Sequence, residues 1–402
     1  MQAAGIIVEY NPLHRGHVHL MQQTRRLLGE DCAIICAMSG DFVQRGDFAL
    51  LNRRARARAA VESGADLVLE LPLPWAVASA ERFADGGVQT LLATGLLTHL
   101  AFGSECGDVE RLMTAAKGLE HPDFPALLKD ALKSGASFPA ARQSALEQLL
   151  GQETAALLAS PNNTLGIEYC RALVRQKSAV SPLTISRLGA EHDAPDAVDG
   201  IASGSSIRAL LHAGQREEAL SLMAPAMAQA YLREEAAGRA PVFSQTQERA
   251  ILARLRTMTE ADFAALDESR EGLYHRLYQA SRTARTVEEF LETAKTRRYA
   301  YARLRRMVLW AYLGLDPHTF PAAPAYLRPL AANETGRALL GAMRKTASVP
   351  VLTKPADVRR LGTEALDLFT LEARAADLYS LSYPDLSAAA PEVLWKEGLV
   401  LL

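Results

Sequence analysis

The stretch GIIVEYNPLHRGH, residues 5–17, decides the fold of this chain. Its apolar run, Gly5 to Val8, predicts a buried strand, and Asn11-Pro12 breaks that strand. His14-Arg15-Gly16-His17 then opens a helical stretch that we expect to continue to about Leu28. Two histidines and a glycine therefore lie where a strand passes into the N-terminus of a helix.

The chemistry of this junction suits a ligand that carries phosphates. Free backbone N–H groups and the helix dipole favour an anion at a helix N-terminus. His14 and His17 share a face of the first turn, and Gly16 allows a bulky ligand to approach the backbone. The arrangement resembles the HxGH signature of the nucleotidyltransferase superfamily and predicts nucleoside triphosphate binding with adenylyl transfer. The alternative is a His-x-x-His pair on a solvated helix face, but the preceding strand and the Asn-Pro break favour the nucleotide site.

Composition sets the class of protein. The chain has 402 residues, 49% of them hydrophobic, which is enough for two or three domains with cores. Its net charge of -2 excludes a global attraction to nucleic acid, so RNA binding would need a local patch. No apolar run approaches a membrane span, and the N-terminus lacks a signal-peptide pattern. Cys32, Cys36, Cys106 and Cys170 show no CxxC spacing, so we expect a reducing, cytoplasmic protein without structural zinc or a membrane partner.

The first hundred residues alternate strands and helices. Strands rich in Ile, Val and Leu that alternate with helices predict βαβ crossovers and a parallel sheet covered on both faces. Ligands of such sheets lie beyond the carboxyl ends of the strands. The expected strands are 4–9, 32–38, 66–71 and 98–103, and the expected helices are 15–28, 53–64 and 79–94.

The rest of the chain is more helical. Residues 108–158 are rich in Ala and Leu and read as a helical insertion. A helix over 161–175, a strand over 183–188 and a Ser-capped helix over 203–212 follow. Residues 235–245 read as a linker. We therefore expect a nucleotidyltransferase-like domain over 1–235 and a mainly helical domain over 246–402.

Polar loops follow several of the predicted strands. In the loop 39–47, two glycines frame Gln44 and Arg45, which could hold a phosphate or a small carboxylate; a solvated loop is the alternative. Arg208 lies in the first turn of its helix, where it opposes the helix dipole, so an anionic ligand would explain it better than local stability. Further candidates are Gly103, which lets a base or ribose pack on the backbone, Asn162, Asn163, Arg187, Ser205 and Ser206.

Together these loops resemble the tRNA(Met) cytidine acetate ligase family. The segments that carry the resemblance are GIIVEYNPLHRGH (5–17), MSGDFVQRGD (38–47), ADLVLELPLPWAVASAERFADGGV (65–88), FGSE (102–105), SPNNTLGIEY (160–169) and IASGSSIR (201–208). The resemblance covers the first 215 residues closely and continues weakly at 295–309. It implies a Rossmann-like, HUP-type nucleotidyltransferase fold with a C-terminal helical domain.

The resemblance also implies an activity. Members of the family activate acetate with ATP as acetyl-adenylate and acetylate the exocyclic amine of the wobble cytidine of elongator tRNA(Met), giving N4-acetylcytidine. His14, His17 and Arg208 would stabilise charge on the α-phosphate and the leaving pyrophosphate, and Mg²⁺ would accompany ATP without a carboxylate cage. The implied ATP contacts are Ile7, Val8, Glu9, Tyr10, Asn11, Pro12, Leu13, His14, Arg15, Gly16, His17, Val18, His19, Leu20, Gly103, Asn162, Arg187, Ser205 and Ser206. Leu13, Arg15 and Asp41 depart from the family pattern, and we expect the Asp41 carboxylate to repel acetate unless Arg45 or Arg15 neutralises it.

A basic stretch at 295–306 contains no acid. Its cations are Lys295, Arg297, Arg298, Arg303, Arg305 and Arg306. On a helix, Arg298 and Arg305 would share a face that attracts phosphates, and Tyr299 and Tyr301 could stack on unpaired bases. The alternative is a solvated helix paired with the acids of 288–292. The concentration of cations in a nearly neutral chain favours tRNA binding.

Two other functions stay open from the residues alone. One is a small-molecule adenylyltransferase of the pantetheine-phosphate or nicotinate type, without RNA. The other is a non-catalytic module that senses nucleotides or binds RNA. Exchange of pyrophosphate into ATP that depends on a carboxylic acid would exclude the second.

Overall fold

The computed structural model describes residues 2–187, 202–266 and 272–402 and contains a seven-stranded sheet with the order β7-β6-β1-β2-β5-β8-β9. The strands are β1 (Ala3–Val8), β2 (Ala33–Ser39), β5 (Leu67–Leu71), β6 (His99–Ser104), β7 (Ser181–Ser186), β8 (Pro329–Ala332) and β9 (Val400–Leu401). The five strands from β7 to β5 are parallel, which confirms the predicted α/β fold, whereas β8 runs antiparallel to β5. A short hairpin of β3 (Phe42–Val43) and β4 (Asp47–Phe48) stands apart.

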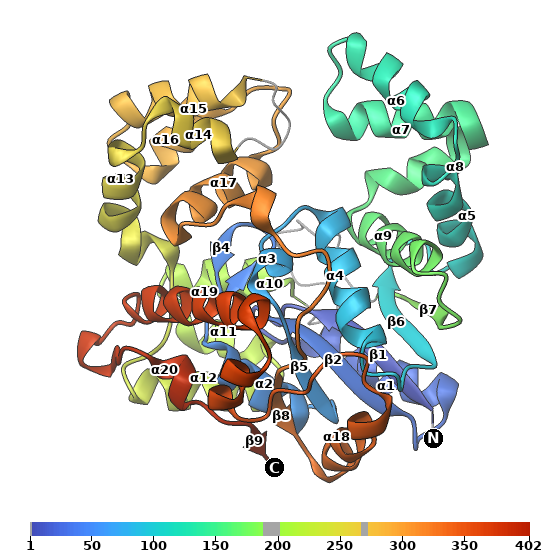
Figure 1. Ribbon diagram of the computed structural model, residues 1–402, viewed down its shortest axis with the longest axis vertical. Helices are drawn as coiled ribbons and strands as arrows, with labels where there is room; N and C mark the ends of the chain where they lie inside the picture. The colour runs from blue at the N-terminus through green and yellow to red at the C-terminus, as the bar shows by residue number, and fades with distance from the viewer. Residues whose placement is uncertain (1, 188–201, 267–271) are drawn as a thin grey trace.

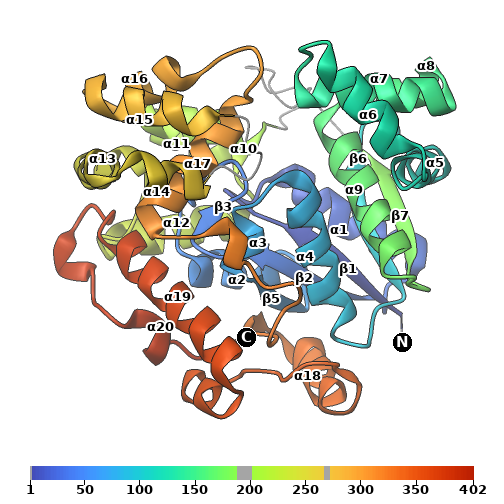
Figure 2. The same cartoon turned by 45° about the horizontal axis from the view of Figure 1, so that its top comes forward.

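Helices cover both faces of the sheet (Figures 1 and 2). One face packs on α4 (Ala80–Leu92), α5 (Val109–Leu119), α9 (Pro161–Arg175) and α18 (Glu334–Thr346); the other packs on α1 (Arg15–Leu28), α2 (Arg53–Glu62), α10 (Gly204–His212), α11 (Arg216–Leu222) and α12 (Pro225–Ala236). Alternate residues of each strand face opposite cores: Ile7 and Ile35 belong to the first, Ile6 and Ile34 to the second. A strand buried on both sides must be apolar at every position, which explains the uninterrupted hydrophobic runs.

Residues 108–158 fold as helices that rise from the sheet beside α9. They are α5, α6 (Phe124–Lys133), α7 (Phe138–Leu150) and α8 (Gln152–Ala156). In Figure 1 this group forms the lobe at the upper right, and we call it the insertion lobe.

A second lobe stands opposite, at the upper left of Figure 1. It contains α13 (Glu248–Thr257), α14 (Glu260–Leu266), α15 (Leu273–Thr283), α16 (Val287–Ala294) and α17 (Tyr301–Leu313), while α19 (Thr363–Ser380) and α20 (Val393–Lys396) lie below it. One core joins the helices from α13 to α17 and the C-terminal half of α19 to the short α3 (Leu73–Ala76) and to the β3–β4 hairpin, whereas α20 packs with the N-terminal half of α19 in a separate core.

The chain returns to the sheet after the helical lobe. β8 and β9 extend the sheet beyond β5, so the C-terminal segment contributes to the same sheet as the N-terminal one. The sequence indicated only helices and Pro-rich interruptions in this part of the chain. Strands of four and two residues, one of them starting at Pro329, are too short to give a periodic signal.

Candidate functional site

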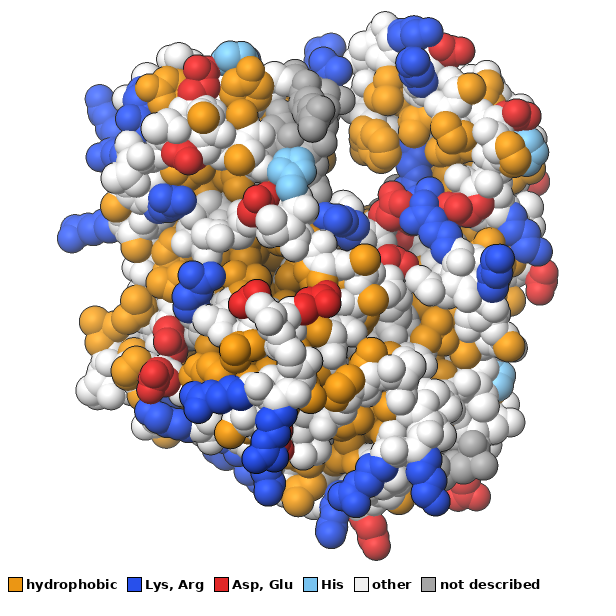
Figure 3. All heavy atoms as spheres, viewed as in Figure 1, with side chains coloured by type: hydrophobic (Ala, Val, Ile, Leu, Met, Phe, Trp, Pro, Cys, Tyr) orange, Lys and Arg blue, Asp and Glu red, His pale blue; other side chains and the backbone are white. Residues whose placement is uncertain are grey.

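A cleft of about 750 Å³ opens beyond the carboxyl ends of the parallel strands. Its walls come from the β1–α1 junction, the loop between β2 and α2, the end of β6, the start of α9, the end of β7 and the start of α10. Pro139 and Leu158 of the insertion lobe, with the adjoining Ala159, close one side. Figure 3 shows a hollow between the two lobes, with hydrophobic side chains on the inner side of the insertion lobe. The location agrees with the rule that parallel α/β sheets bind ligands at this edge.

The N-terminus of α1 is held by two histidines. His14 is the N-cap: its Nδ1 accepts a hydrogen bond from the N–H of Gly16 (3.2 Å), and the N–H of His14 donates to Nδ1 of His17 (3.2 Å). The two ring centroids are 3.8 Å apart. Because Nδ1 accepts in both rings, the proton of each neutral imidazole is on Nε2. Each ring can therefore donate a hydrogen bond from Nε2.

The protonation state of His17 follows from its surroundings. Burial, together with nearby His14 and Arg187, lowers the pKa of His17 well below its ordinary value of 6.5. Tyr10 packs edge-on against its ring at 5.0 Å. His17 is therefore neutral at pH 7, and it donates a hydrogen bond rather than a full charge to an anion.

The opposite wall is built around Glu105, which follows β6. Its carboxylate accepts hydrogen bonds from the backbone N–H groups of Asn162 (3.1 Å) and Asn163 (2.6 Å) at the start of α9. The Asn162 side chain also donates to Glu105 (2.7 Å) and accepts from Arg187 (3.0 Å). Burial lowers the pKa of Arg187, an effect that Glu105 partly offsets. Three separate segments thus place Asn162 and Arg187 side by side, facing the cleft.

The start of α10 contributes a third wall. Ser203 caps the helix by accepting a hydrogen bond from the N–H of Ser206 (3.1 Å). Gly204 is packed so closely that a Cβ there would lie 2.9 Å from the carbonyl oxygen of Asn11. The guanidinium of Arg208 donates to Asn11 Oδ1 (3.2 Å) and pairs with Asp47 Oδ2 (3.0 Å). Arg208 therefore lines the cleft and is also held by partners within the protein.

The loop between β2 and α2 reaches the cleft with Gln44 and Arg45. The N–H of Gln44 donates to the Glu9 carboxylate (2.6 Å), and burial raises the pKa of Glu9 despite this bond. On the other side, Arg306 of α17 donates to the carbonyl oxygen of Gln44 (3.3 Å). Gly46 adopts φ +76°, and a Cβ there would lie 2.5 Å from the backbone nitrogen of Arg306. The loop is thus pressed directly onto the N-terminal half of α17.

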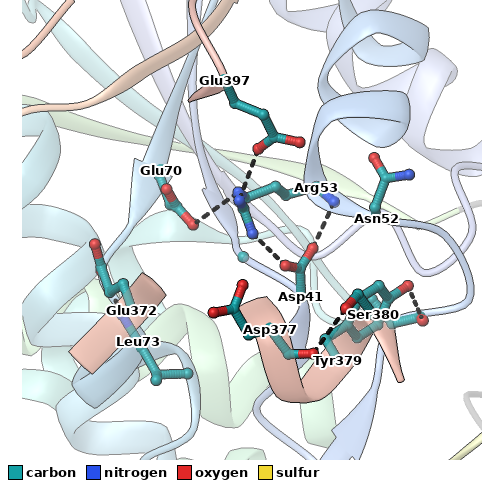
Figure 4. A network of polar contacts seen from close by, with 12 residues as sticks. Asp41, Asn52, Arg53, Glu70, Leu73, Glu372, Asp377, Tyr379, Ser380 and Glu397 are labelled. Atoms are coloured by element: carbon teal, nitrogen blue, oxygen red, sulfur yellow. Dashed lines mark hydrogen bonds and ion pairs between the residues drawn. The ribbon is translucent and has the colours of Figure 1, made fainter. Parts of the chain in front are cut away.

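A buried ionic network holds the base of the same loop (Figure 4). Asp41 accepts from the backbone N–H of Arg53 (2.7 Å) and forms an ion pair with the Arg53 guanidinium. The same guanidinium pairs with Glu397 near the C-terminus (2.7 Å) and lies 3.9 Å from Glu70 at the end of β5. Arg328, just before β8, also pairs with Glu70. The expectation that the Asp41 charge would act on acetate and depend on Arg45 or Arg15 is wrong: Asp41 is buried on Arg53 and does not line the cleft.

Comparison with known proteins agrees with this architecture. Residues 1–392 match the family described as HIGH Nucleotidyl Transferase. The chain is 38% identical over 397 residues to the tRNA(Met) cytidine acetate ligase of Acetivibrio thermocellus, with 95% of each chain covered. It is 34% identical over 400 residues to the protein of that name from Syntrophomonas wolfei, with 96% of each covered.

The chain belongs to the tRNA(Met) cytidine acetate ligase family of HIGH nucleotidyltransferases. Solved structures support the same assignment. Thermotoga maritima TmcAL bound with alpha-thio ATP superimposes with a TM-score of 0.93 at 31% identity, and the apo form with a TM-score of 0.95 at 31% identity; each match covers 100% of both chains. The resemblance on the six sequence segments is therefore confirmed.

Most of the family ATP contacts assigned from sequence lie around one cleft. Those that line it are Ile7, Val8, Glu9, Tyr10, Asn11, Pro12, His14, Gly16, His17, His19, Leu20, Gly103, Asn162, Arg187, Ser205 and Arg208. Four do not line it. Leu13 is fully buried in the core and Val18 packs against that core, Arg15 is exposed and reaches toward Ser221, and Ser206 lies behind the Ser203 cap. A run of consecutive residues at a helix start cannot all face one ligand, because a helix turns about 100° per residue.

The basic stretch is not one helix, contrary to the prediction. Lys295 to Ala300 precede α17, so Arg298 and Arg305 do not share a helix face. Tyr299 is buried in the core of the helical lobe, and Tyr301 donates to Glu288. Tyr299 is therefore not available to stack on a base, and the Arg305 guanidinium lies over the Tyr301 ring, 5.1 Å from its centroid. Arg297 and Arg298 are exposed, whereas Arg305 lines the cleft itself.

Sequence reasoning missed several residues of the site. Asp47 pairs with Arg208 on the cleft wall, Glu105 orients Asn162, and the insertion lobe contributes Pro139. Asp47 and Glu105 lie inside the segments that resemble the family, but the sequence alone did not indicate a role for either residue. Nothing in the sequence around Pro139 indicates that it meets the other loops.

Proposed function

We propose that this chain is an ATP-dependent tRNA(Met) cytidine acetate ligase. The observation that carries the proposal is the joining of two features in one cleft: a pair of histidines on the N-terminus of α1, and a loop with Gln44 and Arg45 that packs on α17. The first suits a triphosphate, and the second suits a small carboxylate next to a basic surface. In this proposal residues 1–235 form the ATP-binding part and residues 246–402 hold tRNA.

The first step joins acetate to AMP. An acetate oxygen attacks the α-phosphorus of ATP, the bond to the β-phosphate oxygen breaks, and pyrophosphate leaves. His14 and His17 donate hydrogen bonds from Nε2 to the phosphates, and the dipole of α1 adds a positive potential at its N-terminus. Arg208 and Arg45, on the facing wall, balance the charge that develops on the leaving group. Asn162 and Arg187 hold the nucleoside at the end of β6 and β7.

The second step transfers the acetyl group. The exocyclic amine of cytidine attacks the acetyl carbonyl carbon, the bond to the phosphate oxygen breaks, AMP leaves, and the amine loses a proton. The loop 39–47 stands between the α1 N-terminus and α17. In this proposal the acetyl group would lie beside the helical lobe. The tRNA backbone would be attracted by the basic stretch, which contains Lys295, Arg297, Arg298, Arg303, Arg305 and Arg306. Arg305 lines the cleft and would lie nearest the reaction.

Mg²⁺ would arrive with ATP. Among the described residues, no group of three His, Cys, Asp or Glu side chains could hold a metal ion. The triphosphate and water would therefore supply most of the ligands, as is usual for Mg²⁺ bound with nucleotides. No helix in the described part of the chain is long and apolar enough to cross a membrane, and we propose that the enzyme acts on tRNA in the cytoplasm.

The test is direct. Purified protein is incubated with ATP, isotopically labelled acetate and total tRNA, and the nucleosides are analysed by mass spectrometry. The expected result is labelled N4-acetylcytidine in elongator tRNA(Met) and none without ATP. Acetate-dependent pyrophosphate exchange without acetylated tRNA would instead indicate a small-molecule adenylyltransferase, and absence of both activities would refute an enzymatic role.

The contribution of the basic segment can be tested separately. Arg297 and Arg298 are exposed, outside α17 and outside the cleft lining, so their removal should leave pyrophosphate exchange intact. Each lost phosphate contact should lower the slope of log affinity against log salt concentration by roughly one. An unchanged slope in the Arg297→Ala/Arg298→Ala double variant would remove this segment from the tRNA surface.

A further inference from the structure

A second, smaller cavity lies between the β3–β4 hairpin and the helical lobe, and we call it the α17 pocket. Its volume is about 110 Å³, against about 750 Å³ for the cleft. One part of its wall is apolar, with Ile251 from α13, Leu291 from α16, and Val308 and Leu309 from α17. The two cavities share two lining residues, Asp47 and Arg305. They therefore meet at the point where the loop 39–47 touches α17.

The charges around the α17 pocket exclude an anionic ligand. Glu248 and Glu288 line it together with Asp47, and Arg305 is the single cation among its lining residues. Glu248 accepts from the backbone N–H of Val287 (2.9 Å), and Glu288 accepts from the Tyr301 hydroxyl. With three acidic side chains against one guanidinium in its wall, the pocket disfavours acetate or a free phosphate. The pocket suits a small, uncharged, flat ring with polar edges.

Hydrogen-bond donors are grouped at the same place. Ser244 and Gln245, at the start of the short helix Ser244–Gln247, line the pocket with Arg305. A guanidinium only donates, while a hydroxyl and an amide can donate or accept. Cytosine presents two acceptors, its ring nitrogen and its carbonyl oxygen, next to its exocyclic amine. Uracil presents an N–H where cytosine has the acceptor nitrogen, so Arg305 favours cytosine.

We propose that the α17 pocket binds the target cytosine ring, swung out of the tRNA loop, with its exocyclic amine directed through the shared boundary into the cleft. The inference rests on the proposed function and names the base subsite of that same reaction. Enzymes that modify a base commonly unstack it into a pocket of this kind, and single-stranded loops make such unstacking easier. The exposed Arg297 and Arg298 lie just before α17, where the flanking phosphates would pass. Asp47, at the boundary, is placed to accept a hydrogen bond from the amine.

The test uses two tryptophan substitutions in one short helix. Ser244 lines the α17 pocket, whereas Thr246 is exposed and does not. Ser244→Trp should fill the pocket and lower acetyl transfer to tRNA by about a hundredfold or more, a loss of the size expected when a reacting group cannot reach its position. Acetate-dependent pyrophosphate exchange and the tRNA dissociation constant should stay within about threefold of wild type, because phosphate contacts dominate affinity. Thr246→Trp should match wild type in all three measurements.

The outcomes separate the pocket from the proposed function. If wild type shows no exchange or no acetylation, the proposed function fails. If wild type is active and Ser244→Trp transfers acetyl at the wild-type rate, or loses exchange in proportion to transfer, the pocket assignment is wrong. Should Ser244→Trp not fold, wild-type enzyme decides: free cytidine should inhibit transfer but not exchange, and free uridine should inhibit neither. Inhibition of exchange by cytidine, or equal inhibition of transfer by both nucleosides, would overturn the proposal.

Discussion

The two sides of the cleft are held in opposite ways. At the start of α1, His14 and His17 bond to backbone groups no more than three residues away. The loop 39–47 instead depends on Arg53 and on Glu397 beneath it, and on Arg306 beside it. The two imidazoles are positioned by local contacts, whereas the loop is assembled from segments hundreds of residues apart.

This difference predicts how mutations on the two sides of the cleft should affect turnover and stability. A change at α1 alters the chemistry of one side chain and leaves the rest of the fold in place. A change in the network below the loop 39–47 removes a partner from several buried charges at once and shifts the position of Gln44 and Arg45. The first kind should reduce turnover with little loss of stability, and the second should reduce stability first.

The largest expected effect on stability is that of Arg53→Met. Arg53 is 4% exposed and faces three carboxylates, those of Asp41, Glu70 and Glu397. Although burial opposes it, Asp41 and Glu397 raise the pKa of Arg53, so the guanidinium is charged. Its removal leaves buried negative charges without compensation, which typically costs about 3–5 kcal/mol. Urea unfolding measures the loss.

The neighbouring arginine is the matched control. Arg54 is exposed on the same turn of α2, and Arg54→Met should change the free energy of unfolding by about 0.5 kcal/mol or less. Equal stabilities of the two variants would mean that the network does not hold the loop, and that the two sides of the cleft differ less than their contacts indicate.

His17→Ala should have the largest effect on turnover. It removes one neutral N–H donor from the phosphates, and loss of such a donor typically lowers the rate by about 10²–10³. His17 also accepts the N–H of His14, so loss of this capping bond should cost about 1 kcal/mol of stability. Acetate-dependent pyrophosphate exchange reports the first effect and urea unfolding the second.

Arg15→Ala is the control for this variant. Arg15 stands between the two histidines but is exposed and does not line the cleft, so exchange should stay near the wild-type rate. A rate loss at Arg15 as large as that at His17 would show that general charge, rather than the two imidazoles, serves the phosphates.

Gly46→Ala tests the contact between the loop and α17. Its φ of +76° costs a residue with a side chain about 1–2 kcal/mol, and the clash with the Arg306 backbone should add about 1–3 kcal/mol. Gly214→Ala separates the two terms, because Gly214 has φ +78° with nothing within 4 Å of its Cβ position. The difference between the two losses in unfolding free energy measures the clash with α17. A difference near zero would mean that the loop is not packed tightly against the helix.

The same contrast explains what could be predicted from sequence. The strand, the Asn-Pro break and the helix start at residues 5–17 are local patterns, and the sheet, the α1 histidines and the cleft were predicted from them. Asp41 was misjudged because its partner Arg53 and the more distant Glu397 share no pattern with it. The basic stretch was misjudged because charge alone does not show where a helix begins. Strands β8 and β9 join the sheet only through tertiary pairing, for which their own residues give no signal.

The smallest expected effect comes from the protonation of His17. Its pKa is lower in the folded protein than the ordinary 6.5 of an unfolded chain, because burial and the neighbouring Arg187 disfavour the imidazolium. Below pH 6.5 the unfolded state therefore binds more protons than the folded state, and the free energy of unfolding falls as pH falls. The slope contributed by this one group is at most about 1.4 kcal/mol per pH unit, until the folded pKa is reached. His17→Gln keeps a side chain that can hydrogen-bond but cannot titrate, so its stability should decline less between pH 6.5 and 5.5 than that of wild type, as measured by urea unfolding at both values. Parallel declines would mean that His17 is as accessible to protons in the folded protein as in the unfolded chain, and that the α1 side of the cleft carries charge rather than neutral donors.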